Sequence, residues 1–260
     1  MKKIIVKLAL VGSMACASQG AFAVDLDPAA SCSGLPSWSE LQSKLASVSP
    51  NASINGGFGL NMWVTVVNRD GYVCAVAYTG SDRNQQWPGS RIISAQKANT
   101  ANAFSLPGLA LSTANLYTAV QPGGSLFGLQ LSNPVDTSAA YAGPAANYGA
   151  INDPLVGHKI GGVNVFGGGL ALYDTQRTLV GAIGVSGDTS CADHNIAWRT
   201  RHALALDYVT SGISGDANRP DNIVFDVRTV PGLQMGVSAK GWGHPKCVNT
   251  TEANLLPTTH

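Results

Sequence analysis

Hydrophobic residues recur along the chain at two spacings, one typical of helices and one typical of strands. Three segments have helical spacing or composition: residues 36–48, 90–104 and 190–209. In the first, Leu41, Leu45 and Val48 lie on one helical face. The second is rich in alanine and contains no glycine or proline. In the third, Ser190 and Asp193 have the spacing of a capping box, so this helix is expected to begin at Ser190.

Five further segments are rich in β-branched, aromatic or alternating apolar residues and predict strands: residues 61–67, 72–79, 169–173, 178–185 and 223–227. The first two flank Asp70-Gly71, where the glycine supplies the positive φ of a tight hairpin turn. Thr65 is the only polar residue between Trp63 and Val67. Both faces of the sheet are therefore expected to be covered.

This alternation of hairpins and helices predicts an α+β fold in which helices cover an antiparallel sheet. Residues 121–166 lose the periodicity and are rich in Gly, Pro, Asn and Ser, which indicates an insertion that is functional or covers a cleft. We expect a single domain over residues 24–260, with its core at about 60–209 and a turn-rich C-terminal extension at 210–260.

Composition excludes several classes of protein. Charged residues make up 12% of the chain and hydrophobic residues 45%, whereas a disordered chain is richer in charge and poorer in apolar residues. A formal charge of +1 without a Lys/Arg cluster argues against a nucleic-acid partner. Outside the N-terminus, no apolar stretch reaches the roughly 20 residues of a membrane span.

The N-terminus has the pattern of a secretory signal. Two lysines precede an apolar run that ends in small residues around Ala23. This pattern predicts a signal peptide over residues 1–23, cleaved after Ala23. The mature protein is therefore expected to be periplasmic or secreted.

Four cysteines follow the predicted cleavage site: Cys32, Cys74, Cys191 and Cys247. An even number in an exported protein predicts up to two disulfides, with three possible pairings. Cys32 and Cys247 lie near the two ends of the mature chain, so each is expected to fasten a terminal segment to the body. The alternative, a metal site, lacks a Cys-x-x-Cys pair or a suitably spaced histidine.

The predicted helix at residues 90–104 has one mixed face, formed by Ile93, Lys97, Thr100 and Phe104. A lysine and a hydroxyl beside apolar residues can bind an anionic, mostly apolar ligand. The alternative is that Lys97 extends to water and Thr100 bonds back to its own helix. Position along the helix does not decide between the two interpretations.

The last predicted helix has a second candidate face. His194, Trp198 and Arg201 are spaced i, i+4 and i+7, so they lie on the same side of the helix. An imidazole, a large flat ring and a guanidinium can together hold an iron atom, a planar ligand and its carboxylates. The alternative is that this face packs against the insertion or a neighbouring subunit.

Several short motifs occur in a fixed order over about residues 60–209. They are residues 95–101 (AQKANTA), residues 168–170 (GGL), residues 180–187 (VGAIGVSG), and the pair Asp193 and Ala197. In this combination the chain resembles the GlcG/HbpS-like family, also called the haem-degrading domain family. The shared order makes the resemblance more specific than any one motif.

The resemblance implies an α/β/α layered domain with an antiparallel sheet, assembly into homo-oligomers and, in several exported members, haem binding. Lys97, Thr100 and Asp193 match the family pattern and are carried over as site residues. Ala171 replaces the usual proline of the second hairpin, and His194 stands where an acidic residue often follows the aspartate. The insertion and the extension are additional to the family pattern.

The sequence therefore predicts an exported haem-binding protein, a scavenger or a sensor accessory, whose partner is haem or another planar anionic small molecule. The expected ligand contacts are Lys97, Thr100, Phe104, Asp193, Trp198 and Arg201, with His194 at the haem iron. Two other classes stay open. One is an enzyme that degrades haem or acts on another small molecule with an external reductant, because no flavin or nicotinamide motif is present. The other is a non-catalytic, oligomeric structural protein.

Overall fold

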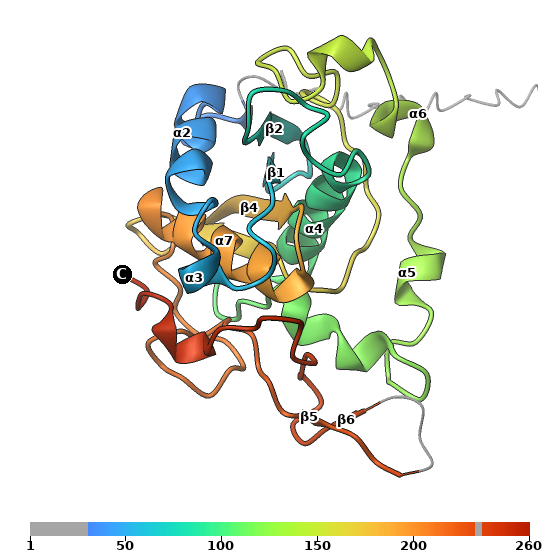
Figure 1. Cartoon of the computed structure of the whole chain (residues 1–260), viewed down its shortest axis with the longest axis vertical. Coiled ribbons are helices and arrows are strands. Elements are labelled where there is room, and N and C mark those ends of the chain that lie inside the picture. Colours follow the sequence, from blue (N-terminus) through green and yellow to red (C-terminus); the bar gives the residue numbers. More distant parts are fainter. Residues whose placement is uncertain (1–30, 232–235) are drawn as a thin grey trace, which may run out of the picture.

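A computed structural model describes residues 31–231 and 236–260, and the predicted signal peptide lies outside them. Four strands form an antiparallel sheet in the order β2-β1-β4-β3. They are β1 (Trp63–Asn68), β2 (Val73–Tyr78), β3 (Gly169–Tyr173) and β4 (Leu179–Ser186). Helix α4 (Ser90–Phe104) covers one face, and α2 (Trp38–Val48) and α7 (Ser190–Ala203) cover the other (Figure 1). The predicted α+β fold with α/β/α layers is confirmed.

Alternation along β1 divides its side chains between two buried clusters, as the period of a strand requires. Val64 and Val66 pack with α2 and α7, whereas Trp63 and Val67 pack with α4. The polar Thr65 is also buried, and its hydroxyl lies 2.8 Å from that of Ser94 on α4. Both faces of the sheet are therefore covered, as the apolar pattern predicted.

Two glycines of the sheet allow α4 to approach closely. A Cβ atom on Gly184 would lie 1.9 Å from the carbonyl oxygen of Ser94, and one on Gly169 would lie 2.5 Å from that of Lys97. Any side chain at either position would push the helix away from the sheet. The two glycines thus set the distance between the α4 backbone at Lys97 and strands β3 and β4.

The structure agrees with the predicted helices at residues 36–48 and 90–104. The third helix begins at Ser190 as predicted, but its capping residue and its C-terminal end differ from the prediction. Helix α7 is capped by Thr189, whose side chain accepts from the backbone N–H of Ala192, and not by Ser190. It ends at Ala203 and not at residue 209, because Ala205 adopts a left-handed conformation with φ of 52°. This conformation cannot continue a right-handed helix.

The insertion at residues 121–166 contains only short elements and lies on the side of α4 (Figure 1). The Arg91 guanidinium of α4 pairs with the buried carboxylate of Asp153 and donates to the carbonyl oxygen of Ala140 at 2.9 Å. These contacts hold the insertion against the helix.

Short helices occur both inside and outside the insertion. They are α3 (Ala52–Asn55), α5 (Leu129–Ser132), α6 (Thr137–Ala140), η1 (Thr113–Leu116), η2 (Thr118–Val120), η3 (Ala145–Asn147) and η4 (Ala253–Leu255).

The strand predicted at residues 223–227 is wrong over most of its length. The only strand pairing here joins β5 (Val227–Arg228) to β6 (Val237–Ser238), within residues 31–231 and 236–260. Ile223 is instead buried in a small cluster with Ala114 and Cys191. Its apolar character reflects packing beside α7 and not a place in a sheet.

Disulfides join Cys32 to Cys74 and Cys191 to Cys247. The first ties the N-terminal segment to β2, and the second ties the extension to α7, which confirms the predicted fastening of both ends.

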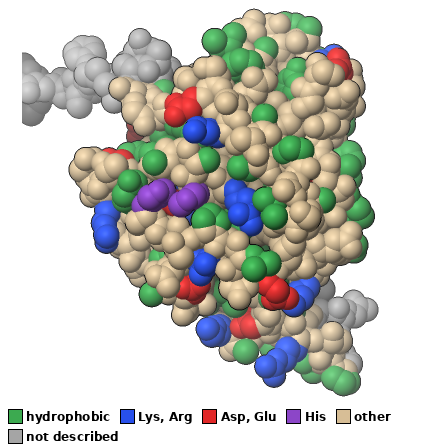
Figure 2. Space-filling model, turned by 60° about the vertical axis from the view of Figure 1, so that its left-hand side comes forward, with side chains coloured by type: hydrophobic (Ala, Val, Ile, Leu, Met, Phe, Trp, Pro, Cys, Tyr) green, Lys and Arg blue, Asp and Glu red, His purple; other side chains and the backbone are tan. Residues whose placement is uncertain are grey.

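Among residues 31–231 and 236–260, no helix is both long and apolar enough to cross a bilayer. On the face shown in Figure 2, basic and acidic side chains are interspersed and form no patch of one sign.

Candidate functional site

Lys97 and Asp193 meet in a buried ion pair between α4 and the start of α7. The Nζ atom of Lys97 lies 2.7 Å from Oδ2 of Asp193 and also donates to the carbonyl oxygen of Val185 at 3.1 Å. The Oδ1 atom of Asp193 accepts from the backbone N–H groups of Gly187 and Asp188, at 3.1 and 2.9 Å. The turn between β4 and α7 thus positions the carboxylate for the lysine.

Burial shifts the pKa of both partners. It lowers the pKa of the Lys97 amine, and it raises the pKa of the Asp193 carboxyl to about 6. Their mutual attraction and hydrogen bond oppose both shifts. As a charged pair, the amine and the carboxylate balance each other's charge inside the protein.

The glycines before β3 make room for the lysine. A Cβ atom on Gly168 would lie 2.3 Å from the carbonyl oxygen of Val185 and 3.0 Å from Nζ of Lys97. The φ of Gly168 is 121°, which a residue with a side chain rarely adopts. The ring of Phe166 lies 4.8 Å from the same Nζ atom. The Gly168-Gly169 motif therefore leaves space for the ion pair in addition to its place at the start of the hairpin.

The other residues of the α4 face have separate surroundings. Thr100 donates to the carbonyl oxygen of Gln96 at 2.7 Å and accepts from the N–H of Asn164 at 2.9 Å. Thr100 therefore bonds back to its own helix, as one sequence interpretation stated. The same interpretation placed Lys97 in water, and this part is wrong because Lys97 has no exposed surface. Phe104 is half-buried against a different apolar cluster, which contains Leu111 and Val165.

The face of α7 predicted from helical spacing exists. The ring centroids of His194 and Trp198 are 6.0 Å apart, and the Arg201 guanidinium lies 4.6 Å from the centroid of the Trp198 ring. All three side chains are fully buried. The sequence interpretation therefore identified the shared face but did not identify what covers it.

The C-terminal extension covers this face. Arg201 makes two hydrogen bonds to the Asp221 carboxylate, at 2.6 and 2.9 Å. Trp198 Nε1 donates to the carbonyl oxygen of Pro257 at 2.9 Å. Neither the insertion nor a neighbouring subunit is needed to explain the burial. Asp221 was missed by sequence reasoning, because no spacing signal links it to α7.

His194 is held at only one of its ring nitrogens. Its Nε2 atom lies 3.1 Å from Oδ1 of Asn222. The backbone N–H of Ile223 is 3.2 Å from the same Nε2 atom and 2.8 Å from Oδ1 of Asn222. Both hydrogen-bonding contacts of the ring are therefore made through Nε2. Within residues 31–231 and 236–260, Nδ1 has no hydrogen-bond partner. Burial lowers the pKa of His194 to about 3, so its ring is neutral.

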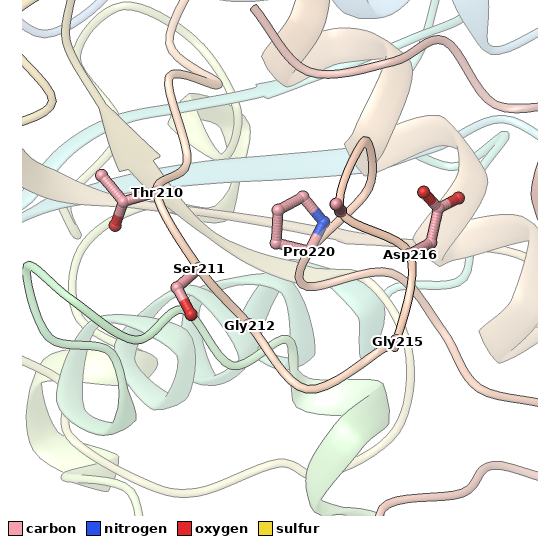
Figure 3. Close-up of a pocket in the computed structure, with 7 residues that line it drawn as sticks. Thr210, Ser211, Gly212, Gly215, Asp216 and Pro220 are labelled. Atoms are coloured by element: carbon pink, nitrogen blue, oxygen red, sulfur yellow. The ribbon is translucent and has the colours of Figure 1, made fainter.

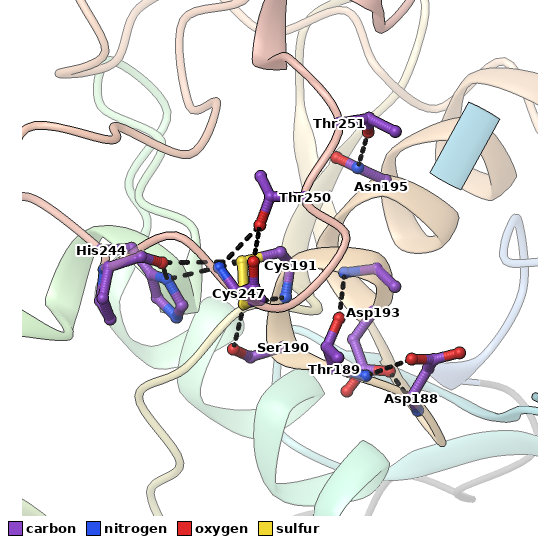
Figure 4. Close-up of a disulfide and its surroundings, with 12 residues drawn as sticks. Asp188, Thr189, Ser190, Cys191, Asp193, Asn195, His244, Cys247, Thr250 and Thr251 are labelled. Atoms are coloured by element: carbon purple, nitrogen blue, oxygen red, sulfur yellow. Dashed lines mark hydrogen bonds between the residues drawn. A yellow bond between two sulfur atoms is a disulfide. The ribbon is translucent and has the colours of Figure 1, made fainter. Parts of the chain in front are cut away.

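A second buried histidine lies beside the Cys191–Cys247 disulfide (Figure 4). The Nδ1 atom of His244 lies 2.7 Å from the carbonyl oxygen of Pro245, which places its proton there. Its Nε2 atom has no partner in the described part of the chain. Burial lowers the pKa of His244 to about 4.

An open hollow of about 330 Å³ lies in the extension (Figure 3). Its lining residues are Thr210, Ser211, Gly212, Gly215, Asp216, Ala217 and Pro220. None of the residues predicted to bind the ligand lines this hollow. Those on α7 and the Lys97–Asp193 pair are instead enclosed by protein.

Comparison with known proteins gives a family match and several similar solved structures, of which three are described. The model of the family described as haem degrading protein HbpS-like matches residues 51–201. Klebsiella pneumoniae protein ORFY is 24% identical, over 65% of this chain and 90% of its own, with a TM-score of 0.43. A PduOC:heme complex is 22% identical, over 65% and 94%, with a TM-score of 0.42, and HbpS is 17% identical, over 65% and 89%, with a TM-score of 0.37. No curated protein matches the chain.

Proposed function

Because the chain belongs to the HbpS-like family of haem-degrading proteins, we propose that it is an exported haem-binding protein, a scavenger or a sensor accessory. One observation supports this proposal most. His194 is neutral and keeps an unpartnered ring nitrogen, within the described residues, on a face that also carries Trp198 and Arg201. A neutral imidazole nitrogen is a common ligand of haem iron.

The donor set fits the chemistry of haem. His194 would bind the iron, Trp198 would lie against the ring and Arg201 would bind a propionate carboxylate. Bound haem supplies a redox-active iron at this position. Arg201 now pairs with Asp221, so a propionate would replace one carboxylate by another.

The α4 face contributes the second part of the proposed site. Lys97, Thr100 and Asp193 are the residues that match the family pattern, whereas Phe104 packs in a different apolar cluster. Lys97 could bind a second propionate only if Asp193 released it. In the present arrangement Asp193 compensates its charge.

Access to His194 requires the extension to move. Asn222 and Ile223 contact its Nε2 atom, and Asp221 and Pro257 bond to the neighbouring residues of α7. These contacts fill the face on which the haem would lie.

Export is supported by the two disulfides, which form and persist in oxidising compartments. The N-terminal pattern of residues 1–23 points to the same route. Assembly into a homo-oligomer stays a prediction, and native mass spectrometry of the purified protein tests it.

The test is an absorbance titration of the mature, untagged protein with hemin. We expect a saturable Soret band, and we expect His194→Ala to weaken binding by about tenfold or more and to shift the band. His158→Ala is the matched control, because His158 is exposed and lies in the insertion. Urea unfolding verifies that each variant is folded. A titration without saturation, or identical curves for wild type and His194→Ala, contradicts the proposal.

The family description favours one second candidate, haem degradation. Oxidative opening of the ring consumes dioxygen and electrons, so an external reductant such as ascorbate must be supplied. Loss of the Soret band with ascorbate, together with ring-opened products in mass spectrometry, supports degradation. A stable band under the same conditions supports binding alone.

A further inference from the structure

A compact group of histidine and aspartate side chains lies at the C-terminal end of α7, directly after Arg201. Two histidine side chains lie side by side on the face shown in Figure 2. The rings of His202 and His260 are stacked, with centroids 4.5 Å apart and an interplanar angle of 16°. Asp207 lies beneath them, with its side chain 1% exposed.

The end of α7 builds this arrangement. The N–H of Ala205 donates to the carbonyl oxygen of His202 at 2.9 Å, and that of Leu206 donates to the carbonyl oxygen of Arg201 at 3.3 Å. These two bonds are those of a Schellman motif, which reverses the chain after the helix. The reversal brings Asp207 back under His202.

The neighbouring strand fixes the backbone of Asp207. Tyr173 of β3 forms a parallel bridge with Asp207, and its N–H donates to the carbonyl oxygen of Leu206 at 2.8 Å. The carboxylate is therefore held on a strand edge and not on a loose loop. Sites on rigid elements need less reorganisation when they bind a ligand.

The last residues of the extension supply the second imidazole. The N–H of Thr259 donates to the carbonyl oxygen of Asn218 at 2.9 Å, which anchors the residue before His260. The His260 ring also stacks on Tyr208, with centroids 5.2 Å apart. His260 thus has its backbone and one face of its ring positioned by other residues.

The three side chains converge on one point. The Nδ1 atom of His202 lies 2.8 Å from Oδ2 of Asp207, and Nδ1 of His260 is hydrogen-bonded to Oδ1 of the same carboxylate. One ligand atom from each of the three residues lies within 4.8 Å of the others. Two nitrogens and one carboxylate oxygen at this spacing can share a single ion after small side-chain rotations.

The charge of the group suits a cation. Burial disfavours ionisation of Asp207, but hydrogen bonds from His260 and His202 and the charge of Arg201 outweigh it and hold the pKa of the carboxyl below its usual value. An ion would bind the Nδ1 atoms of imidazoles that carry their proton on Nε2. Since the His202 and His260 side chains are 34% and 38% exposed, solvent can reach them and accept the displaced hydrogen bond.

We propose that His202, Asp207 and His260 form a binding site for a divalent transition-metal ion such as Zn²⁺, with water completing the coordination. Imidazole and carboxylate ligands suit Zn²⁺ and its neighbours in the first transition row. Three protein ligands leave the ion an open position. This site is independent of the proposed haem function.

A second cluster could be confused with this one. Cys191, His244 and Cys247 also lie close together. Their two sulfur atoms are bonded to each other, so they offer no thiolate while the disulfide is intact. The experiment therefore omits reducing agents.

The test is calorimetric titration of the mature, untagged protein with Zn²⁺ at neutral pH. We expect one ion per chain, and we expect His202→Ala and His260→Ala each to weaken binding by about tenfold or more. His158→Ala is the control and is expected to bind like wild type. Asp207 is left unchanged because its buried carboxylate supports the fold.

Co²⁺ gives a second measurement on the same variants, because its visible absorption reports the ligands directly. A band that appears in wild type and disappears in both histidine variants supports the site. Absence of saturable Zn²⁺ binding, or equal Zn²⁺ affinity in wild type, His202→Ala and His260→Ala, overturns it. Urea unfolding excludes loss of folding as the reason for weaker binding.

Discussion

The amine of Lys97 and the carboxylate of Asp193 form an ion pair with a separation of 2.7 Å, and the two side chains are 0% and 2% exposed. One belongs to the helix on one face of the sheet and the other to the helix on the opposite face. They meet where β4 ends and α7 begins. The pair therefore links the two helical layers at the C-terminal end of β4.

Removing one partner of this pair is expected to destabilise the protein strongly. Lys97→Met leaves a buried carboxylate without its counter-charge, which costs about 3–5 kcal/mol in the free energy of unfolding. Asp193→Asn leaves the Lys97 amine buried without a counter-charge, at a similar cost. Urea unfolding of both single variants and the double variant measures the coupling. A double variant that costs as much as the sum of the singles contradicts a direct interaction.

The two buried histidines are expected to make the protein less stable in mild acid. Burial lowers the pKa of His194 to about 3 and that of His244 to about 4, from 6.5 in the unfolded chain. Between these values the unfolded chain binds more protons, so stability that is present above pH 6.5 is lost as the pH falls. The free energy of unfolding should drop by about 2 kcal/mol per histidine between pH 7 and 5.

Asp193 opposes part of this change, because burial raises its pKa to about 6. Its folded form takes up a proton before the unfolded form does, which restores about 1 kcal/mol over the same interval. Urea unfolding at pH 7 and pH 5 measures the net loss. In His194→Gln the loss should be about 2 kcal/mol smaller than in wild type. An equal loss in the two proteins contradicts the assigned burial.

The sequence pattern was sufficient to predict the layered fold but not the contacts of the site. Hydrophobic period and turn residues locate the hairpins and two of the helices, because these signals are local. Lys97 and Asp193 were both identified, yet 96 residues separate them and no spacing rule pairs them. The end of α7 was missed because Ala205 occupies a left-handed position that usually carries glycine.

The cover over α7 was missed for a different reason. Asp221 and Asn222 bind α7 through side-chain hydrogen bonds within an irregular segment. Such contacts leave no periodic trace in a sequence. The polar residues of the extension therefore looked like an ordinary turn-rich tail.

Ala205 allows a prediction about stability. A non-glycine residue in the left-handed region costs about 1 kcal/mol, so Ala205→Gly should raise the free energy of unfolding by about that amount. Ala203→Gly, within the last turn of α7, is the matched control and should lower it by about 0.5–1 kcal/mol. Thermal or urea unfolding of both variants decides the point. The same sign for both changes would show that the end of α7 is misassigned.

The Cys191–Cys247 disulfide is expected to contribute substantially to stability, because its cysteines are 56 residues apart. Loss of the cross-link in Cys191→Ser/Cys247→Ser should cost about 4 kcal/mol on the chain-entropy model. Amide exchange should increase mainly in the extension, since the disulfide holds it to α7. Exchange that increases equally along the whole chain contradicts a local anchoring role.

Asn222 is expected to control access to His194. Its side chain contacts Nε2 of His194 and donates to the carbonyl oxygen of Ala253 at 3.0 Å. Asn222→Ala removes both contacts, so the cover should open more often and hemin should associate faster. Stopped-flow absorbance measures the rate, with Asn218→Ala as a control elsewhere in the extension. A slower or unchanged rate contradicts the role of the cover.

Hydrogen–deuterium exchange with and without saturating hemin shows whether haem binds against α7 beneath the C-terminal extension. We expect exchange to change in peptides from α7 and from residues 219–225, while peptides around His158 stay unchanged. Hemin that saturates the protein but leaves both of these regions unchanged would contradict this expectation.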